Sequence, residues 1–247
     1  MVQPGIDQWA LQYMKKYNTK PGQAVIYGTY QAYLKSTPST LATHLEAARS
    51  GDFTLGVKLV RGAYLGSDAR ELMYERKEDT DAAYNGIAKS ILTRQWGEVL
   101  TGSGTFPDTS LVLATHNAQS VQLARTICEA GLARTSIAFA QLQGMADEVS
   151  CALVARPRVA GDEMSDHLMS GASANRVGSP KYRAQLSREP LQTYKYLVWG
   201  SAGDCMKYLL RRAYENRDAI QRTKSCRDAM WQELARRVRV AIFPGRV

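Results

Sequence analysis

The sequence has no long apolar segment. Its most apolar stretches, near residues 24–30 and 111–114, are far shorter than the roughly 18 residues that a membrane-spanning helix needs. The first 18 residues also lack the apolar core of a secretory signal peptide, and they carry Asp7, unlike an arginine-rich, acid-poor transit segment. We therefore expect neither a spanning helix nor a targeting segment in these 247 residues.

Cysteine and histidine are scarce, with four and three copies. The cysteines form no CxxC pair and have no suitably spaced histidine, so the sequence predicts reduced thiols rather than a zinc site or a disulfide framework. No metal site is predicted. The chain also lacks a glycine-rich dinucleotide fingerprint and the GxxxxGK[ST], HExxH and GxSxG motifs. A nucleotide cofactor would therefore have to be held by residues at the ends of strands.

The overall composition is that of an ordinary globular protein, with 45% hydrophobic and 22% charged residues. This excludes disordered and fibrous proteins. The net charge of +9 is concentrated near the C-terminus, because residues 203–247 hold 11 basic and 5 acidic residues, against 21 and 18 in residues 1–202. Such asymmetry is compatible with a nucleic acid, an anionic membrane surface, or arginines that bind anionic ligands.

Apolar segments alternate with helical patterns along the chain. After a helix over 6–17, five strands are predicted at 24–31, 55–60, 111–115, 136–140 and 192–198. Each is followed by a predicted helix, and these helices run from 36 to 49, 79 to 95, 118 to 130, 146 to 155 and 204 to about 222. Five strand-then-helix units predict an α/β fold with a parallel sheet, because parallel strands need crossover connections. We expect Val25, Val57, Leu59, Val112 and Ile137 to line the inner face of this sheet.

Two segments depart from the alternation. Residues 161–190 are rich in Gly, Ser, Asn, Asp and Pro, which predicts a surface insertion. The last helix, over 227–242, places Met230, Trp231, Leu234, Val238 and Ile242 on one stripe, with Arg236, Arg237 and Arg239 off it. We interpret it as a docking helix with a basic outer face.

Polar side chains collect where the predicted strands end. They are Gln31, Tyr33, Lys58, Arg61, His116, Asn117, Gln141 and Tyr196. In parallel α/β proteins the carboxyl ends of the strands form the ligand face, so one crevice could receive all of them.

Each of these residues also has a purely structural interpretation. A lone histidine such as His116 is more often a hydrogen-bonded structural residue than a ligand. Lys58 lies within an apolar strand and needs an anion, which an ion pair to a carboxylate or a ligand could supply equally well. Arg61 precedes two small residues that would let backbone approach a phosphate, although this signal is weak.

The residues Arg211 and Arg212 are adjacent on a predicted helix, where two solvated cations are the usual interpretation. If that turn faces the site, the pair would suit a small carboxylate substrate, since each guanidinium is a planar fork of donors. Tyr64, Tyr196 and Tyr208 are as compatible with core packing as with a site.

Five blocks of sequence closely resemble the proline dehydrogenase (proline oxidase) family, especially its fungal mitochondrial form. They are VIYGTYQAYL at 25–34, VKLVRGAYL at 57–65, ATHN at 114–117, FAQLQGMAD at 139–147 and YLLRRAYEN at 208–216. The resemblance implies a (β/α)8 TIM-type barrel. It begins at what should be the fourth barrel strand, so residues 1–247 are expected to form one domain that is the C-terminal part of an incomplete barrel, with about five βα units.

The resemblance also implies an activity. The family oxidises L-proline to 1-pyrroline-5-carboxylate, the first step of proline catabolism to glutamate, by hydride transfer to N5 of FAD, and the electrons pass to a quinone. A mitochondrial location at the inner membrane or matrix face, with peripheral membrane contact, is implied as well.

Site residues follow from the same blocks. The residues implied to contact FAD are Gln31, Lys58, Val60, Gly62, Ala63, Thr115, His116 and Asn117, with Arg61 by the phosphates or ribityl chain. Tyr64, Leu142 and Tyr196 would wall the proline ring, and Arg211 and Arg212 would clamp its carboxylate, with Glu215 fixing the arginines or the cofactor sugar.

Two other functions compete with this one. An inactive truncated barrel could act as a binding protein or as a module that interacts with a membrane surface through its basic C-terminal helix. Nucleic-acid binding is not favoured, because the basic C-terminal segment lacks interleaved aromatic platforms and any known reading motif.

Overall fold

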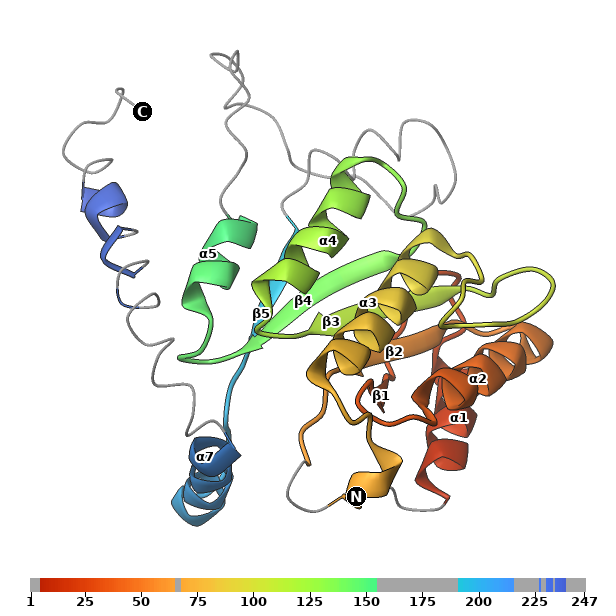
Figure 1. Ribbon diagram of the computed structural model, residues 1–247, viewed down its shortest axis with the longest axis horizontal. Helices are drawn as coiled ribbons and strands as arrows, with labels where there is room; N and C mark the ends of the chain where they lie inside the picture. Colours follow the sequence, from red (N-terminus) through yellow and green to blue (C-terminus); the bar gives the residue numbers. More distant parts are fainter. Residues whose placement is uncertain are drawn as a thin grey trace.

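The computed structural model describes residues 5–64, 68–154, 191–215, 227, 230–232 and 234–238. Within these ranges the predicted alternation of strands and helices is observed (Figure 1). The elements in chain order are α1 (Ile6–Tyr17), β1 (Gly28–Gln31), α2 (Thr37–Gly51), β2 (Leu55–Val60), a 3-10 turn η1 (Arg70–Leu72), α3 (Lys77–Thr93), β3 (Thr109–Ala114), α4 (Ala118–Glu129), β4 (Ser136–Leu142), α5 (Asp147–Val154), β5 (Gln192–Tyr196) and α7 (Ala202–Glu215).

The five described strands form one parallel sheet in the order β1-β2-β3-β4-β5. Sequential order with a helix after each strand is the arrangement of a (β/α)8 barrel, in which every strand lies beside its chain neighbours. The register aligns Lys58 of β2 with Val112 of β3, and Val112 with Ala138 of β4. The carboxyl ends of all five strands therefore lie along the same side of the sheet, which we call the sheet edge in describing the site.

The two faces of the sheet differ in what covers them. Helices α2, α3 and α4 lie on one face (Figure 1), where Leu55, Val57, Leu59 and Leu113 are fully buried. The alternate residues, which include Lys58 and Val60, point to the opposite face and are partly exposed. Among the described elements, none packs across that opposite face, which we call the open face.

The prediction for the inner face was therefore mostly wrong. The inner face of a barrel is the face opposite the helices, but Val57 and Leu59 lie on the helix-covered face, and Ile137 packs against the same core. Of the five residues expected inside, Val112 does lie on the open face, in register with Lys58. Because side chains alternate along a strand, the apolar run at 55–60 could not show which set faces the helices.

The first strand is shorter than predicted, and Val25 is 72% exposed rather than internal. The cause is Asn18, whose side-chain oxygen accepts hydrogen bonds from the backbone amides of Val25 and Ile26, at 2.9 and 3.0 Å. Its Nδ2 donates to the carbonyl oxygens of Ile26 and Thr54. These bonds hold residues 25–26 away from regular strand pairing, so β1 begins only at Gly28.

The insertion predicted at 161–190 lies outside the described residues. For the last helix, the described residues are helical, but Met230, Trp231, Leu234 and Val238 are 48–71% exposed, so the predicted docking of this stripe is not seen among them. Ile242 and Arg239 are not described. No helix in the described part of the chain is both long enough and apolar enough to cross a membrane.

Candidate functional site

The carboxyl ends of β1 and β2 are joined by a side chain that the sequence singles out. Gln31, the last residue of β1, accepts a hydrogen bond on Oε1 from the backbone amide of Ala63, at 3.0 Å. The loop after β2 is thereby fixed to the end of β1, and it brings Val60, Gly62 and Ala63 to the sheet edge. A Cβ atom at position 62 would lie 2.1 Å from the Tyr33 ring. This close packing is sufficient to explain why the position is glycine.

Tyr33 itself does not belong to the site, although it follows a strand end. Its ring is buried and its hydroxyl donates to Asp68 Oδ2 at 2.5 Å. Gln141 is buried on the helix-covered side as well, where its Oε1 accepts a hydrogen bond from the Ser150 hydroxyl at 3.0 Å. Gln141 points to the helix-covered side because side chains alternate along β4, whereas Tyr33 lies in the turn after β1 and packs in a small cluster with Leu34 and Met73.

Lys58 projects from the middle of β2 onto the open face. Its Nζ lies 5.5 Å from the centre of the Tyr196 ring. Among the described residues, no carboxylate lies within ion-pair distance of this ammonium, so the structural alternative of an ion pair finds no support there. The cation is left facing the open side of the sheet, where an anionic or hydrogen-bond-accepting ligand could reach it.

The neighbouring Arg61 has a different environment. Its guanidinium donates three hydrogen bonds, to Asp81 Oδ1 at 2.8 Å, Thr115 Oγ1 at 2.6 Å and Ser120 Oγ at 2.7 Å. The guanidinium carbon also lies 4.3 Å from the centre of the buried Tyr84 ring. Arg61 therefore links the end of β2 to α3, α4 and the end of β3.

The turn after β3 carries Thr115, His116 and Asn117. Asn117 caps α4, since its Oδ1 accepts from the Ser120 amide at 3.0 Å. His116 Nε2 accepts from the backbone amide of Leu142 at 3.1 Å, which assigns the proton of the neutral ring to Nδ1. This bond joins the ends of β3 and β4, so His116 has at least the structural role that a lone histidine usually has.

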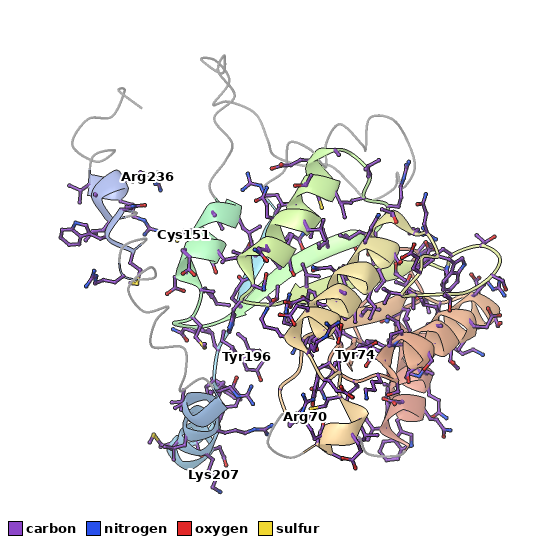
Figure 2. The ribbon with its side chains drawn as sticks, in the orientation of Figure 1. Arg70, Tyr74, Cys151, Tyr196, Lys207 and Arg236 are labelled. Atoms are coloured by element: carbon purple, nitrogen blue, oxygen red, sulfur yellow. The ribbon has the colours of Figure 1, made fainter. Side chains whose placement is uncertain are left out.

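An aromatic and cationic cluster lies at the end of β5. Tyr196, the last residue of β5, is 51% exposed and lies beside α7 (Figure 2). Its ring is 5.9 Å from that of Tyr208, and the Arg212 guanidinium is 5.4 Å from the Tyr208 ring. Arg211 lies 4.4 Å from the Tyr64 ring and donates to the Ala63 carbonyl oxygen at 3.5 Å. Arg211 therefore contacts the loop after β2 although it is exposed, and the partly buried Arg212 lies beside Tyr208.

Tyr208 is a residue for which the sequence interpretation left core and site roles open, and the family resemblance gave it no role. Its spacing along the helix is the same for a core aromatic and for a site residue, so no sequence signal separates the two. The structure places it between Tyr196 and Arg212. Leu142 pairs with Tyr196 in the strand register and is half-buried at the same edge. Glu215 ends α7, and its side chain lies outside the described part of the structure.

The open face has a floor of mostly small side chains. Between Lys58 and Tyr196 it presents Val112 and Ala114 on β3 and Ala138 and Ala140 on β4, with the larger Leu142 beside Tyr196. A broad planar ring can lie against such a floor. Lys58 at its margin would suit the hydrogen-bond acceptors of a flavin ring.

Comparison with known proteins agrees with this geometry. The chain matches the proline dehydrogenase family over residues 3–225. It is 31% identical to proline dehydrogenase 1, mitochondrial, of Caenorhabditis elegans, in an alignment that covers 99% of this chain and 35% of the relative. The probable mitochondrial proline dehydrogenase of Schizosaccharomyces pombe is 30% identical, with 91% and 42% covered. Hydroxyproline dehydrogenase of Mus musculus is 32% identical, with 86% and 40% covered. The chain thus spans less than half the length of these relatives.

A solved structure supports the fold. Proline utilization A from Bdellovibrio bacteriovorus superimposes with a TM-score of 0.56 at 20% identity, over 87% of this chain and 19% of that chain. At this identity the similarity shows a shared fold, which confirms the predicted α/β, TIM-type class. The family match spans nearly all of the chain, and its sequence blocks converge on one edge of one parallel sheet. The chain therefore belongs to the proline dehydrogenase family.

Proposed function

We propose that the chain forms the flavin- and substrate-binding part of a mitochondrial proline dehydrogenase, which oxidises L-proline to 1-pyrroline-5-carboxylate. The observation that carries the proposal is the convergence of Arg211 and Arg212 with Lys58 and Tyr196 at one sheet edge. Family membership and the mitochondrial names of the C. elegans and S. pombe relatives support it.

FAD is the cofactor that this site would hold. When bound, FAD would supply N5 as the acceptor of a hydride from the proline carbon beside the nitrogen, and the electrons would then pass to a quinone. Lys58 would stabilise negative charge on the flavin ring, since a lysine ammonium is a compact donor of three hydrogen bonds. Gln31, Val60, Gly62 and Ala63 would bind through the edge of the β2 loop, and Thr115, His116 and Asn117 through the turn after β3.

The arginine pair would bind the carboxylate of proline. The guanidinium groups of Arg211 and Arg212 lie over the rings of Tyr64 and Tyr208. These contacts restrict the arginine side chains before the substrate binds. A charge-assisted, forked interaction with a carboxylate is the strongest hydrogen-bonding arrangement that arginine makes. Glu215 would fix the arginines or the cofactor sugar.

Tyr64, Leu142 and Tyr196 would enclose the apolar ring of proline. Leu142 and Tyr196 are paired residues at the ends of β4 and β5, and Tyr64 lies under Arg211. Walls of this kind exclude water from the reacting carbon, and the arginines at one end set the direction in which the substrate lies. Orientation and desolvation are therefore the contributions of the protein itself.

The test is a proline-dependent reduction of FAD by the chain combined with further βα units that complete an eight-stranded barrel. A complete enzyme should bleach the visible absorbance of bound flavin when proline is added under anaerobic conditions and should reduce a quinone analogue in turnover. Hydroxyproline should be assayed beside proline, because the M. musculus relative is a hydroxyproline dehydrogenase. A complete, flavin-loaded barrel that proline does not reduce would refute the proposed function.

A further inference from the structure

Arg61 and its partners form a closed ring of hydrogen bonds at the end of β3. Arg61 donates to Thr115 and to Ser120, Thr115 Oγ1 also accepts from the Asn117 amide at 3.1 Å, and Asn117 Oδ1 accepts from the Ser120 amide at 3.0 Å. The Thr115 and Ser120 side chains are buried. The ring therefore encloses the whole turn from 115 to 117.

Asp81 on α3 anchors this ring from the side opposite to the turn. It accepts from Arg61 Nε at 2.8 Å and also from Lys77, and the Arg61 and Asp81 side chains are only 23% and 24% exposed. Ser120 adds a further link, since its hydroxyl donates to Asn85 Oδ1, also on α3, at 2.5 Å. The position of the turn is thus determined by α3 through Arg61.

A guanidinium is the group that this arrangement requires. It has to reach a carboxylate and two hydroxyl oxygens in three directions while its flat face lies 4.3 Å from the Tyr84 ring. A lysine ammonium is a single point and cannot span three partners on three elements. The same three bonds direct the nitrogens of Arg61 into the protein rather than toward the open face.

We propose that Arg61 is a positioning residue, which holds the turn 115–117 in its flavin-binding conformation and does not itself bind the phosphates of the cofactor. The inference rests on the proposed function, because the turn is assigned to the flavin there. Arg61 acts through Thr115 and Asn117, and Asp81 acts through Arg61.

The experiment compares Arg61→Met, Arg61→Lys and Asp81→Asn with the matched control Arg94→Met in the 247-residue chain. Arg94 is also paired with an aspartate, Asp108, at 2.7 Å and has similar exposure, but it follows α3 at the opposite edge of the sheet. Two readouts are used: hydrogen exchange of the Asn117 and Ser120 amides, and the dissociation constant of FAD from flavin fluorescence.

Arg61→Met and Asp81→Asn should each speed exchange of both amides about tenfold or more and weaken FAD binding by a similar factor, because a charge-assisted bond is lost. Arg61→Lys should fall in between, and Arg94→Met should change the melting temperature only. Tighter or unchanged FAD binding in Asp81→Asn would overturn the inference, since a phosphate-binding arginine would be released by that change. If neither the parent chain nor any variant binds FAD, the exchange data alone decide the role of Arg61, and the proposed function is decided separately by the assay on the complete barrel. Unchanged exchange in Arg61→Met refutes the inference.

Discussion

Lys58 and Tyr196 come from opposite parts of the sheet, yet the lysine ammonium lies 5.5 Å from the centre of the tyrosine ring. Three strand spacings of about 4.8 Å separate β2 from β5. The two side chains therefore lean across β3 and β4, where the open face carries mostly small residues such as Val112, Ala138 and Ala140. The two side chains meet above those small residues, so a flavin bound on this floor would take the place of the contact between Lys58 and Tyr196.

Removing either arginine should weaken proline binding without releasing the flavin. In a complete enzyme, Arg211→Met or Arg212→Met should raise the KM for proline by roughly one to two orders of magnitude, because a desolvated carboxylate loses a charge-assisted pair worth about 1.5–3 kcal/mol. Steady-state kinetics with a quinone analogue measure this. Lys207→Met is the control for the loss of a positive charge, since Lys207 is exposed on α7, one turn before Arg211 (Figure 2). An unchanged KM in both arginine variants would remove them from the site.

The Arg61 network should make stability depend on pH through Asp81. Partial burial raises the pKa of Asp81, but hydrogen bonds from Lys77 and Arg61 outweigh it and hold the pKa below its usual range. A carboxyl with a lowered pKa stabilises the fold above its unfolded pKa of about 3.9, and this stability is lost as the pH falls through the folded pKa.

The Asp81→Asn variant should therefore be less stable than the parent at neutral pH, by about 1 kcal/mol because the pair is partly exposed to water. The difference should shrink as the pH is lowered below about 4. Urea unfolding at a series of pH values measures it. Asp79→Asn serves as the control, because the pair of Asp79 with Arg76 is on the exposed side of α3. If the difference in unfolding free energy between the parent and Asp81→Asn stays constant across the pH range, then the Asp81 carboxylate does not stabilise the fold through its bonds to Arg61 and Lys77.

The sequence predicted the elements well where local pattern decides them. The strand at 55–60 has the bounds that its apolar run indicates, and the parallel order of the sheet follows from alternation alone. β1 was mispredicted because a distant side chain, Asn18, captures the backbone at 25–26 and links it to Thr54. Pairings of this kind depend on the folded chain and leave no periodic signal.

For the site residues, too, the sequence predicts what local pattern decides and not what depends on contacts in the folded chain. Lys58 stood out because a charge in an apolar strand needs a reason, and the structure gives it an open face. Arg61 gave a weaker signal for a phosphate ligand, and the sequence could not show that Asp81, Thr115 and Ser120 surround it. The role of Tyr208 stayed open at the sequence level, because aromatic residues at helical spacing are as compatible with a core as with a site.

The exposed stripe near the C-terminus leads to a prediction about membranes. Met230, Trp231, Leu234 and Val238 are exposed on helical residues of a strongly basic segment, a combination that favours binding at an anionic lipid surface. The chain should co-sediment with anionic vesicles and be released by salt. Trp231→Ser combined with Leu234→Ser should weaken binding, and Gln232→Ser should not. Binding that is absent, or insensitive to salt, would contradict this prediction.

A last prediction concerns the chain expressed alone, which should bind FAD weakly and should not oxidise proline. The described sheet has two unpaired edges, at β1 and β5, whereas a barrel abolishes such edges by closing. Beside the β1 edge, α1 exposes Ile6, Trp9, Tyr13 and Tyr17, each 49–69% exposed, on the side away from its buried Met14. Such surface favours aggregation or pairing with another segment.

The consequence for the site is electrostatic. Lys58, Arg211 and Arg212 lie at a face that water can enter, and the attraction between charges weakens several-fold in water relative to a closed site. Three further βα units could be supplied as a fusion or as a separate fragment from a family member. They should restore solubility, bound flavin and activity together, because closure of the barrel would cover the exposed residues of α1 and exclude water from the site. Gel filtration, flavin absorbance and quinone reduction measure the three effects. If the 247-residue chain alone is a soluble monomer with stoichiometric FAD and proline-dependent quinone reduction, the view that closure is required is wrong.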